Sequence, residues 1–381
     1  MRIAYICLSP TLGMHQYTAD LANRMSERGH EVHLVSSARL PRDRYAASLH
    51  QRTPLANRTT GFSSEGLQLR TFRRLAAVLE SLQADVNHFT APHLWNPLLL
   101  RRLQSATMHT LHDLDPHQGG GALSSLLVRL WNRLVLHSAD HILVHGQVYR
   151  RRLLASGHPP AKITTTPLLH LMFSQAVESR LRGQRPDPTA ATGRRPYALF
   201  FGRLLPYKGL DVLLSAWQRL AESGRFPGDQ PPSLVVAGAG DVQACWQGTL
   251  PAGVELRNHW LDDEETVMLF GSAALVVLPY VSATQSALVA AAYFFGKPVI
   301  VADSGALAEY VQPGITGWVT PPCDAPSLAA ALAAAFDDPA RLAQMGAAGR
   351  AWYDQQRVLE FEALQQTYTR LAAKGNDRIT P

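Results

Sequence analysis

Two cations in a glycine-bounded turn are the first residues in this sequence whose types and spacing suggest chemistry. In residues 200–211, Phe-Phe-Gly-Arg-Leu-Leu-Pro-Tyr-Lys-Gly-Leu-Asp, a predicted buried strand ends at Gly202 and a predicted helix begins near Gly209. Arg203 and Lys208 lie between them. Cations beside a helix N-terminus form a cradle for a diphosphate, because the unpaired amides and the side chains both attract anions. The alternative is a surface turn with two solvated cations, and the Walker pattern of a P-loop is missing.

A loop rich in histidine and aspartate follows another predicted strand, at Thr110-Leu-His-Asp-Leu-Asp-Pro-His117. His112 is suited to hydrogen-bond a sugar or to carry a proton near neutral pH. The alternative is a histidine that only orients the loop. A metal site made of His112, His117 and either Asp113 or Asp115 is a further alternative. We expect no metal at this loop. An acidic tripeptide as short as Asp113-Leu-Asp115 often occurs by chance, so it is weak evidence for a metal site.

The turn at residues 10–15 is a third candidate, because Gly13 permits close approach of the backbone to a ligand. We interpret His15, in the same turn, as structural. His145 ends a predicted strand and is interpreted as an acceptor-side or structural residue.

The elements that position these residues alternate between strand and helix. Strand, helix and strand follow one another within the first 36 residues, which predicts a βαβ unit in a parallel sheet. The alternation stops in the Pro- and Arg-rich residues 174–196 and restarts at Tyr197. The fold class expected is therefore α/β, with two doubly wound Rossmann-like domains that bind ligands at the carboxyl ends of their strands, facing each other across a cleft. The expected boundaries are 1–173 for an acceptor-side domain, 174–196 for a linker, 197–350 for a donor domain, and 351–381 for a terminal helix that crosses back to the first domain.

Composition excludes several classes of protein. The chain has 381 residues, of which 46% are hydrophobic and 17% charged, so it can bury a core and is not intrinsically disordered. The chain contains no run of 18 apolar residues, so we expect no membrane-spanning helix. Its first residues have the pattern of a strand and not that of a signal peptide. The three cysteines are far apart, which argues against disulfides and a structural zinc site. We expect a cytoplasmic protein.

The charge is unevenly distributed along the chain. Residues 1–175 hold 19 Lys/Arg and 10 Asp/Glu, or +9, and the rest of the chain holds 17 and 20, or −3, which together give +6. This asymmetry suits an anionic partner, and the stretch with Arg70, Arg73 and Arg74 beside Leu69, Phe72 and Leu75 is a candidate for reversible attachment to a membrane. The alternative is that these arginines are solvated. Nucleic acid is not expected, since the basic half lacks interleaved aromatic residues.

At residues 201–211 the sequence resembles the phosphate-gripping motif of glycosyltransferase family 4, whose members have the two-domain GT-B fold. The resemblance covers nearly the whole chain and is more specific in the second half. The other segments that carry it, in order, are Gly29-His30-Glu31-Val32, Val236-Ala-Gly-Ala-Gly240, Ala273–Tyr280, Gly296–Glu309 and Gly314-x-x-Gly317.

One departure from the family pattern concerns donor recognition. Two glutamates that the family usually carries would fall at positions 283 and 291, and this chain has Ala283 and Ala291. The loop resembles that of a branch of the family with Gln-Ser in this place. The resemblance implies that helix N-terminal amides still face the donor. By this resemblance, the residues that bind the donor are Gly13, Gly202, Arg203, Lys208, Gly238, Thr284, Gln285, Ser286, Ala287 and Glu309. The residues that the resemblance implies for catalysis are His112, Arg203 and Lys208.

The resemblance implies an enzyme that moves a sugar from a nucleoside-diphosphate sugar to a hydroxyl of a carbohydrate or glycolipid. It also implies retention of the anomeric configuration and a role in polysaccharide or glycoconjugate biosynthesis. We expect independence from metals and cofactors, because Arg203 and Lys208 already supply two positive charges and no convincing ligand cluster exists outside residues 112–117. Two alternatives stay open. A nucleotide-sugar epimerase would need the carboxylates that are missing, and a catalytically silent GT-B subunit would not need the intact Arg203 and Lys208.

Overall fold

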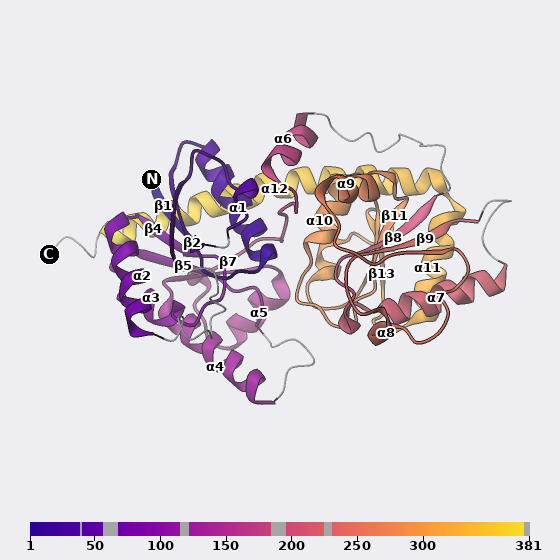
Figure 1. The fold of residues 1–381 in the computed structure, drawn as a ribbon, viewed down its shortest axis with the longest axis horizontal. Helices are drawn as coiled ribbons and strands as arrows, with labels where there is room; N and C mark the ends of the chain where they lie inside the picture. Colours follow the sequence, from indigo (N-terminus) through magenta and orange to yellow (C-terminus); the bar gives the residue numbers. More distant parts are fainter. Residues whose placement is uncertain (39, 56–67, 115–121, 184–195, 225–230, 377–381) are drawn as a thin grey trace. The chain divides into compact units, whose positions relative to one another are not determined.

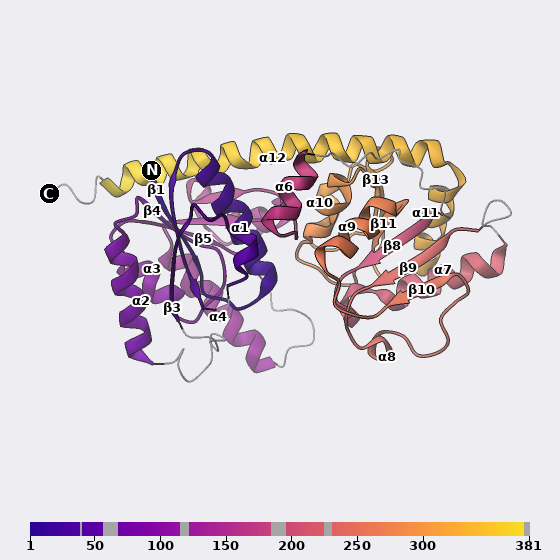
Figure 2. The same ribbon diagram turned by 45° about the horizontal axis from the view of Figure 1, so that its top comes forward.

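The computed structural model describes residues 1–38, 40–55, 68–114, 122–183, 196–224 and 231–376, and it divides into two compact units (Figures 1 and 2). The first unit comprises Met1–Glu178 and Val358–Pro381, and the second comprises Ser179–Arg357. The expected linker, 174–196, contains helix α6 (Gln175–Gly183) instead of being irregular from its start. The rest of that linker, residues 184–195, lies outside the described residues.

The first unit is built on a parallel sheet of seven strands in the order β3-β2-β1-β4-β5-β6-β7. Its central strands are buried on both faces, as the apolar run Ile3–Leu8 predicts for a parallel sheet covered by helices. The strands are β1 (Arg2–Cys7), β2 (Glu31–Ser37), β3 (His50–Leu55), β4 (Val86–Phe89), β5 (Ala106–Thr110), β6 (His141–Val144) and β7 (Ile163–Thr165). The helices are α1 (Leu12–Glu27), α2 (Leu69–Leu82), α3 (Asn96–Arg102), α4 (Ala122–Ser138) and α5 (Gln147–Ala155), with 3₁₀ turns η1 (Arg42–Arg44) and η2 (Pro160–Lys162).

The second unit repeats this architecture with six parallel strands in the order β10-β9-β8-β11-β12-β13. Its core lies between the sheet and helices α7 and α11, with Trp217 fully buried and its ring 6.3 Å from that of Phe336. The strands are β8 (Tyr197–Phe201), β9 (Ser233–Ala237), β10 (Val254–Arg257), β11 (Leu275–Leu278), β12 (Val299–Ala302) and β13 (Gly317–Thr320). The helices are α7 (Leu210–Ser223), α8 (Val242–Cys245), α9 (Asp263–Ser272), α10 (Ala287–Phe294) and α11 (Ala325–Asp337), with 3₁₀ turns η3 (Pro206–Lys208) and η4 (Leu307–Tyr310). Two doubly wound sheets confirm the predicted fold class.

The last helix differs from its prediction. The sequence pattern indicated separate helices at 339–350 and about 352–372, but α12 (Pro339–Asn376) is one helix of 38 residues. Gly346 and Gly349 do not end the helix. They let it approach α10 and the turn after it closely, since a Cβ on Gly349 would lie 2.4 Å from the ring of Tyr293 and one on Gly346 would lie 2.0 Å from the carbonyl oxygen of Gly296. The expected boundary at residue 350 therefore falls inside a helix, and the compact units divide within it, at Arg357–Val358.

The end of α12 packs on the sheet of the first unit. The hydroxyl of Tyr368 is 3.0 Å from that of Tyr5 and 2.7 Å from Nδ1 of His88, and all three residues are buried. His88 Nε2 continues this chain of hydrogen bonds to the Thr110 hydroxyl, 2.7 Å away. These hydrogen bonds tie the last helix to the carboxyl end of β5.

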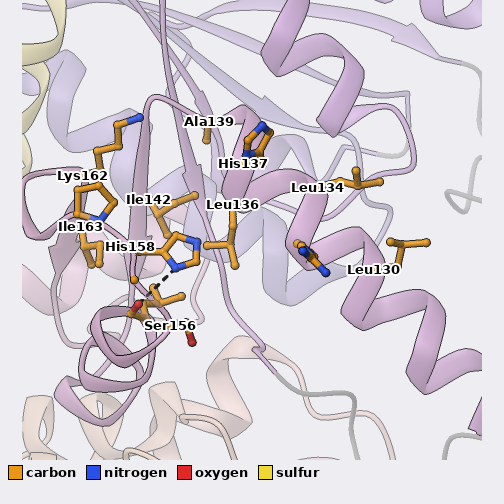
Figure 3. A pocket seen from close by; sticks show the side chains of 14 residues that line it. Leu130, Leu134, Leu136, His137, Ala139, Ile142, Ser156, His158, Lys162 and Ile163 are labelled. Carbon is orange, nitrogen blue, oxygen red and sulfur yellow. Dashed lines mark hydrogen bonds between the residues drawn. The ribbon is translucent and has the colours of Figure 1, made fainter.

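Two further features concern the surface. In the part of the chain that the structure describes, no helix is both long enough and apolar enough to cross a membrane. A groove of about 660 Å³ lies beside α4, between that helix and residues 156–163 (Figure 3).

Candidate functional site

The turn between β8 and α7 is held tightly against the neighbouring strand end. Gly202 and Gly209 both have positive φ, +112° and +68°, which glycine adopts without strain. A Cβ on Gly209 would fall 2.0 Å from the carbonyl oxygen of Pro279, just after β11. The two glycines at the ends of the predicted cradle therefore permit both its backbone path and its close contact with the end of β11.

Lys208 is buried in this turn, with 9% of its surface exposed. Its Nζ donates a hydrogen bond to the hydroxyl of Tyr280 at 2.8 Å and lies 4.6 Å from the centroid of that ring. The hydroxyls of Tyr280 and Ser286 are 3.4 Å apart. Tyr280 was not among the predicted site residues, although the Leu-Pro-Tyr that ends its strand was a signal for it.

The start of α10 lies beside this lysine. Ser286 is the N-cap residue, and its hydroxyl accepts from the amide of Leu288 at 3.3 Å. Ala287 is the first helical residue. The other first-turn amides have no carbonyl partner within the helix, so this end of α10 carries partial positive charge.

The loop before α10 is fixed by the loop that follows β12. The amide of Ala283 donates to the Ser304 hydroxyl at 2.9 Å, and the amide of Ala306 donates to the carbonyl of Thr284 at 2.9 Å. A Cβ on Gly305 would lie 1.9 Å from the Ala283 carbonyl oxygen, so glycine is required there. Gln285 follows in this loop, and its Oε1 is buried without a hydrogen-bond partner. A buried carbonyl oxygen of this kind is a ready acceptor for a ligand hydroxyl or amide.

The β9 turn meets the β8 turn at Gly238. A Cβ on Gly238, at φ +144°, would lie 2.0 Å from the carbonyl oxygen of Gly202, so any other residue would push the two turns apart. Arg203, next to Gly202, and Glu309, in η4, are both exposed. The structure thus brings Gly202, Lys208, Gly238 and Ser286 together at the carboxyl ends of the strands, with Tyr280 among them.

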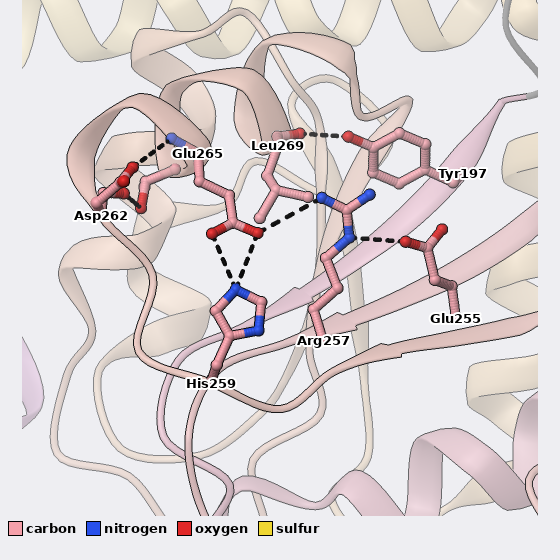
Figure 4. Close-up of polar contacts among 8 residues, drawn as sticks. Tyr197, Glu255, Arg257, His259, Asp262, Glu265 and Leu269 are labelled. Atoms are coloured by element: carbon pink, nitrogen blue, oxygen red, sulfur yellow. Dashed lines mark hydrogen bonds and ion pairs between the residues drawn. The ribbon is translucent and has the colours of Figure 1, made fainter.

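A network of polar contacts that was not predicted from the sequence holds the loop after β10 (Figure 4). Arg257 Nε lies 2.7 Å from Glu255 Oε1, and its Nη1 lies 3.6 Å from Glu265 Oε1. His259 Nε2 lies 2.9 Å from the other Glu265 oxygen. The amide of Gly238 donates to the Arg257 carbonyl at 3.0 Å, which connects this network to the cradle.

In the first unit, His112 is buried at the carboxyl end of β5. Its Nε2–H donates to the Thr90 carbonyl at 2.9 Å, and its ring packs edge-on against Tyr17, with the centroids 4.9 Å apart. Burial lowers the pKa of His112, so the ring is neutral at physiological pH. The neutral ring with Nε2 protonated leaves Nδ1 as a hydrogen-bond acceptor.

His145 lies beside His112, and the two ring centroids are 5.4 Å apart. Its Nδ1 donates to the Thr166 carbonyl at 3.2 Å, and its Nε2 is buried without a partner. The other predicted histidine of this edge, His15, bonds the Tyr45 hydroxyl at 2.8 Å through Nδ1.

Gly13 lies in the first turn of α1, not in a turn before it, because the helix begins at Leu12 and the amides of Met14 and His15 already bond the Thr11 carbonyl. A Cβ at Gly13 would have no neighbour within 4 Å. The protein itself therefore does not require glycine there, and the space beside it is open.

Among the described residues, no three His, Cys, Asp or Glu side chains come together in a way that holds a metal ion. Asp115 and His117, which belonged to the alternative metal site, lie outside those residues. Metal independence therefore stays a prediction.

Comparison with known proteins agrees with this geometry. A family model for glycosyl transferases group 1 matches residues 195–338, and one for the glycosyl transferase 4-like domain matches residues 13–169. The D-inositol 3-phosphate glycosyltransferase of Kribbella flavida is 27% identical over 373 residues, covering 88% of this chain and 85% of that protein.

Two solved structures share the fold. Sucrose-phosphate synthase from Thermosynechococcus elongatus has a TM-score of 0.69 at 20% identity, covering 98% of this chain and 100% of that one. HepE from Anabaena in complex with UDP-glucose has a TM-score of 0.65 at 15% identity, covering 99% and 100%.

The two matched domains and the two doubly wound sheets define a glycosyltransferase of GT-B fold. The chain belongs to the family-4-like glycosyltransferases, which confirms the predicted family and the predicted enzyme class.

Proposed function

We propose that this enzyme transfers a sugar from a nucleoside-diphosphate sugar to a hydroxyl of a carbohydrate or glycolipid, in polysaccharide or glycoconjugate biosynthesis. The observation that carries the donor class is the buried Lys208, whose Nζ lies beside Tyr280 and the N-terminal end of α10. A lysine held in low dielectric, next to helix amides, suits a diphosphate. The UDP-glucose bound in HepE and the inositol phosphate in the name of the Kribbella relative support this choice of substrates.

In the proposed reaction, the acceptor oxygen forms a bond to the anomeric carbon and the bond from that carbon to the diphosphate oxygen breaks. The acceptor proton leaves with the departing diphosphate or with solvent. Lys208, Arg203 and the first amides of α10 neutralise the negative charge that develops on the leaving group. Preorganised charges of this kind contribute several kcal/mol in a site that excludes water.

We propose that the neutral ring of His112 accepts a hydrogen bond from a hydroxyl of the transferred sugar. Its buried position and the Thr90 carbonyl fix the ring, which makes it a precise acceptor and a poor acid. In the second unit, Gln285, with its buried unpartnered oxygen, and Ser286 would bind the donor. We also propose Gly13 and Glu309 as donor contacts, on the resemblance to the family.

We propose that the anomeric configuration is retained, as in family 4, and that no metal or cofactor is needed. The buried Lys208, the exposed Arg203 and the helix amides would supply the positive charge that a divalent ion gives in other glycosyltransferases. Activity that survives exhaustive chelation would support this proposal. Loss of activity on chelation, restored by manganese, would contradict it and point back to Asp113 and Asp115.

We propose a cytoplasmic location with reversible attachment to an anionic membrane face. The +9 charge of residues 1–175 supports this. The stretch first considered for the contact forms α2, but Leu75 is fully buried there and Phe72 packs on Trp95, with 5.3 Å between the centroids. Of the apolar residues in that stretch, only Leu69 is exposed, so α2 offers arginines without an apolar face.

The test is a panel of nucleoside diphosphates and nucleotide sugars, read first by thermal shift and then by product analysis with carbohydrate acceptors. A ligand at 100 times its Kd should stabilise the protein by about 2.7 kcal/mol. Release of the nucleoside diphosphate that depends on the acceptor, with formation of a glycoside, supports the proposal. Binding without turnover would favour the silent subunit, which Ala283 and Ala291 suggested, and isomerisation of the sugar without an acceptor would favour an epimerase.

A further inference from the structure

Helix α4 carries an unusual exposed apolar face. Five of the twelve large apolar side chains that stand exposed in the described part of the chain belong to it. They are Leu126 (64% exposed), Leu127 (50%), Val128 (37%), Leu130 (53%) and Leu134 (42%). Leu126, Leu130 and Leu134 are spaced by four residues, so they form one stripe along the helix. The opposite side of α4 is anchored in the protein, since Val135 is fully buried and Trp131 Nε1 donates to the His93 carbonyl at 3.1 Å.

Cations flank the leucine stripe. Arg129 and Arg133, also spaced by four, are exposed and lie on the helix next to Leu130 and Leu134. Residues 122–162 contain six Lys/Arg and one acidic residue, Asp140. The Asp140 carboxylate is occupied by the amide and hydroxyl of Thr107, both 3.0 Å away.

The groove beside α4 is also lined by apolar and cationic side chains (Figure 3). Its apolar lining includes Leu130, Leu134 and Ile163, and the cations Arg133 and Lys162 also line it. No carboxylate is found among the described residues that line the groove. The surface therefore combines apolar and positively charged side chains, which suits an amphiphile with an anionic head.

We propose that the exposed face of α4 and its groove are the surface by which this enzyme docks on an anionic phospholipid bilayer. The stripe formed by Leu126, Leu130 and Leu134 enters the boundary between headgroups and acyl chains. The cations Arg129, Arg133 and Lys162 meet the phosphates. A second copy of the chain fits this surface less well, because a two-fold contact would bring identical positive charges together. The inference builds on the peripheral attachment proposed above, does not depend on glycosyl transfer, and places the contact on α4 and not on α2.

The experiment is co-sedimentation of the full chain with mixed phosphatidylglycerol–phosphatidylcholine vesicles and with pure phosphatidylcholine vesicles, at low and at high salt. The parent protein is expected to bind the anionic vesicles at low salt only. Leu126→Gln, Leu130→Gln and Leu134→Gln combined should abolish binding. Arg129→Gln with Arg133→Gln should weaken it by about 25-fold, at about fivefold for each charge near the surface. All five side chains are exposed, so the variants should fold, which circular dichroism and melting verify.

Matched controls are Arg70→Gln with Arg73→Gln on α2, and Leu69→Gln with Leu98→Gln, which replace equally exposed side chains on other helices of the same unit. These variants should bind as the parent does. If the parent binds and the α4 variants bind equally well, the attachment is real and α4 is the wrong surface. If the parent does not bind anionic vesicles, both the attachment and this surface are wrong. A dimer in light scattering that the leucine variant abolishes would show that a second copy covers the face, and would overturn the inference.

Discussion

The Nζ of Lys208 and the hydroxyl of Tyr280 are 2.8 Å apart and buried, although 72 residues separate them in the chain. This contact joins the β8–α7 turn to the end of β11 and leads on to Ser286 at the start of α10. It gives the candidate donor site a cation that is held in place by a hydroxyl.

Lys208→Ala should weaken binding of a nucleoside diphosphate by about 10- to 150-fold, because a hydrogen bond to a charged group contributes about 1.5–3 kcal/mol. Arg203→Ala should have an effect of the same kind. Calorimetric titration with nucleoside diphosphates measures it. Arg219→Ala, an exposed arginine on α7, is the control and should bind like the parent. Undiminished affinity in Lys208→Ala would remove this residue from the donor site.

Tyr280→Phe keeps the ring beside Lys208 and removes only the hydroxyl that accepts from Nζ. We expect a smaller loss than in Lys208→Ala, about 1 kcal/mol in donor affinity. The loss should appear in the KM for the donor. A kcat that falls with an unchanged KM would mean that Tyr280 acts in the transition state and does not simply position the lysine.

Gly238→Ala and Gly13→Ala should separate a structural glycine from a ligand-facing one. In Gly238→Ala the added Cβ is expected to clash with the Gly202 carbonyl. The substitution should therefore lower the free energy of unfolding by about 1–3 kcal/mol and weaken donor binding with it.

Gly13→Ala meets open space inside a helix, so the free energy of unfolding should stay the same or rise by up to about 1 kcal/mol. Donor-sugar affinity should nevertheless fall if the backbone there approaches the ligand. Melting curves and titrations of the two variants give both quantities. Full donor affinity in Gly13→Ala would exclude Gly13 from the site.

Acid should destabilise the first unit, because this unit buries several neutral histidines. Burial lowers the pKa of His15 and of His141 to about 4, and that of His109 to about 3. Histidines in the unfolded chain take up protons near pH 6.5, so stability is fully present above that pH and falls as the pH drops from 6.5 towards 4. At pH 5, each histidine with a folded pKa of about 4 should cost about 2 kcal/mol relative to pH 7.

Denaturant unfolding at a series of pH values measures this slope. His141→Gln should make the slope shallower, whatever its effect on stability at pH 7. His137→Gln, an exposed residue of α4, is the control. A free energy of unfolding that does not change between pH 7 and pH 5 would contradict the prediction.

Much of the fold follows from the sequence alone. Apolar runs such as Leu275–Leu278 and the glycines that end other strands are local signals, and a regular βα alternation admits few topologies. The strands that escaped prediction, β3, β7, β10 and β13, are the edge strands of the two sheets and carry polar residues or little alternation. β3 reads His-Gln-Arg-Thr-Pro-Leu and lies at the edge of its sheet, where burial imposes little pattern on the chain.

The sequence by itself determined the residue types of the cradle. Gly202, Arg203 and Lys208 stand within seven residues of one another, so their proximity follows from covalent connection. Tertiary structure decided what Lys208 touches, because Tyr280 reaches it only through the parallel pairing of β8 with β11. It also decided that Leu75 turns into the core while Leu130 and Leu134 face outward on α4. Helical periodicity identifies an apolar stripe, but whether the stripe is covered depends on which elements pack beside it, and neighbours distant in the chain settle that.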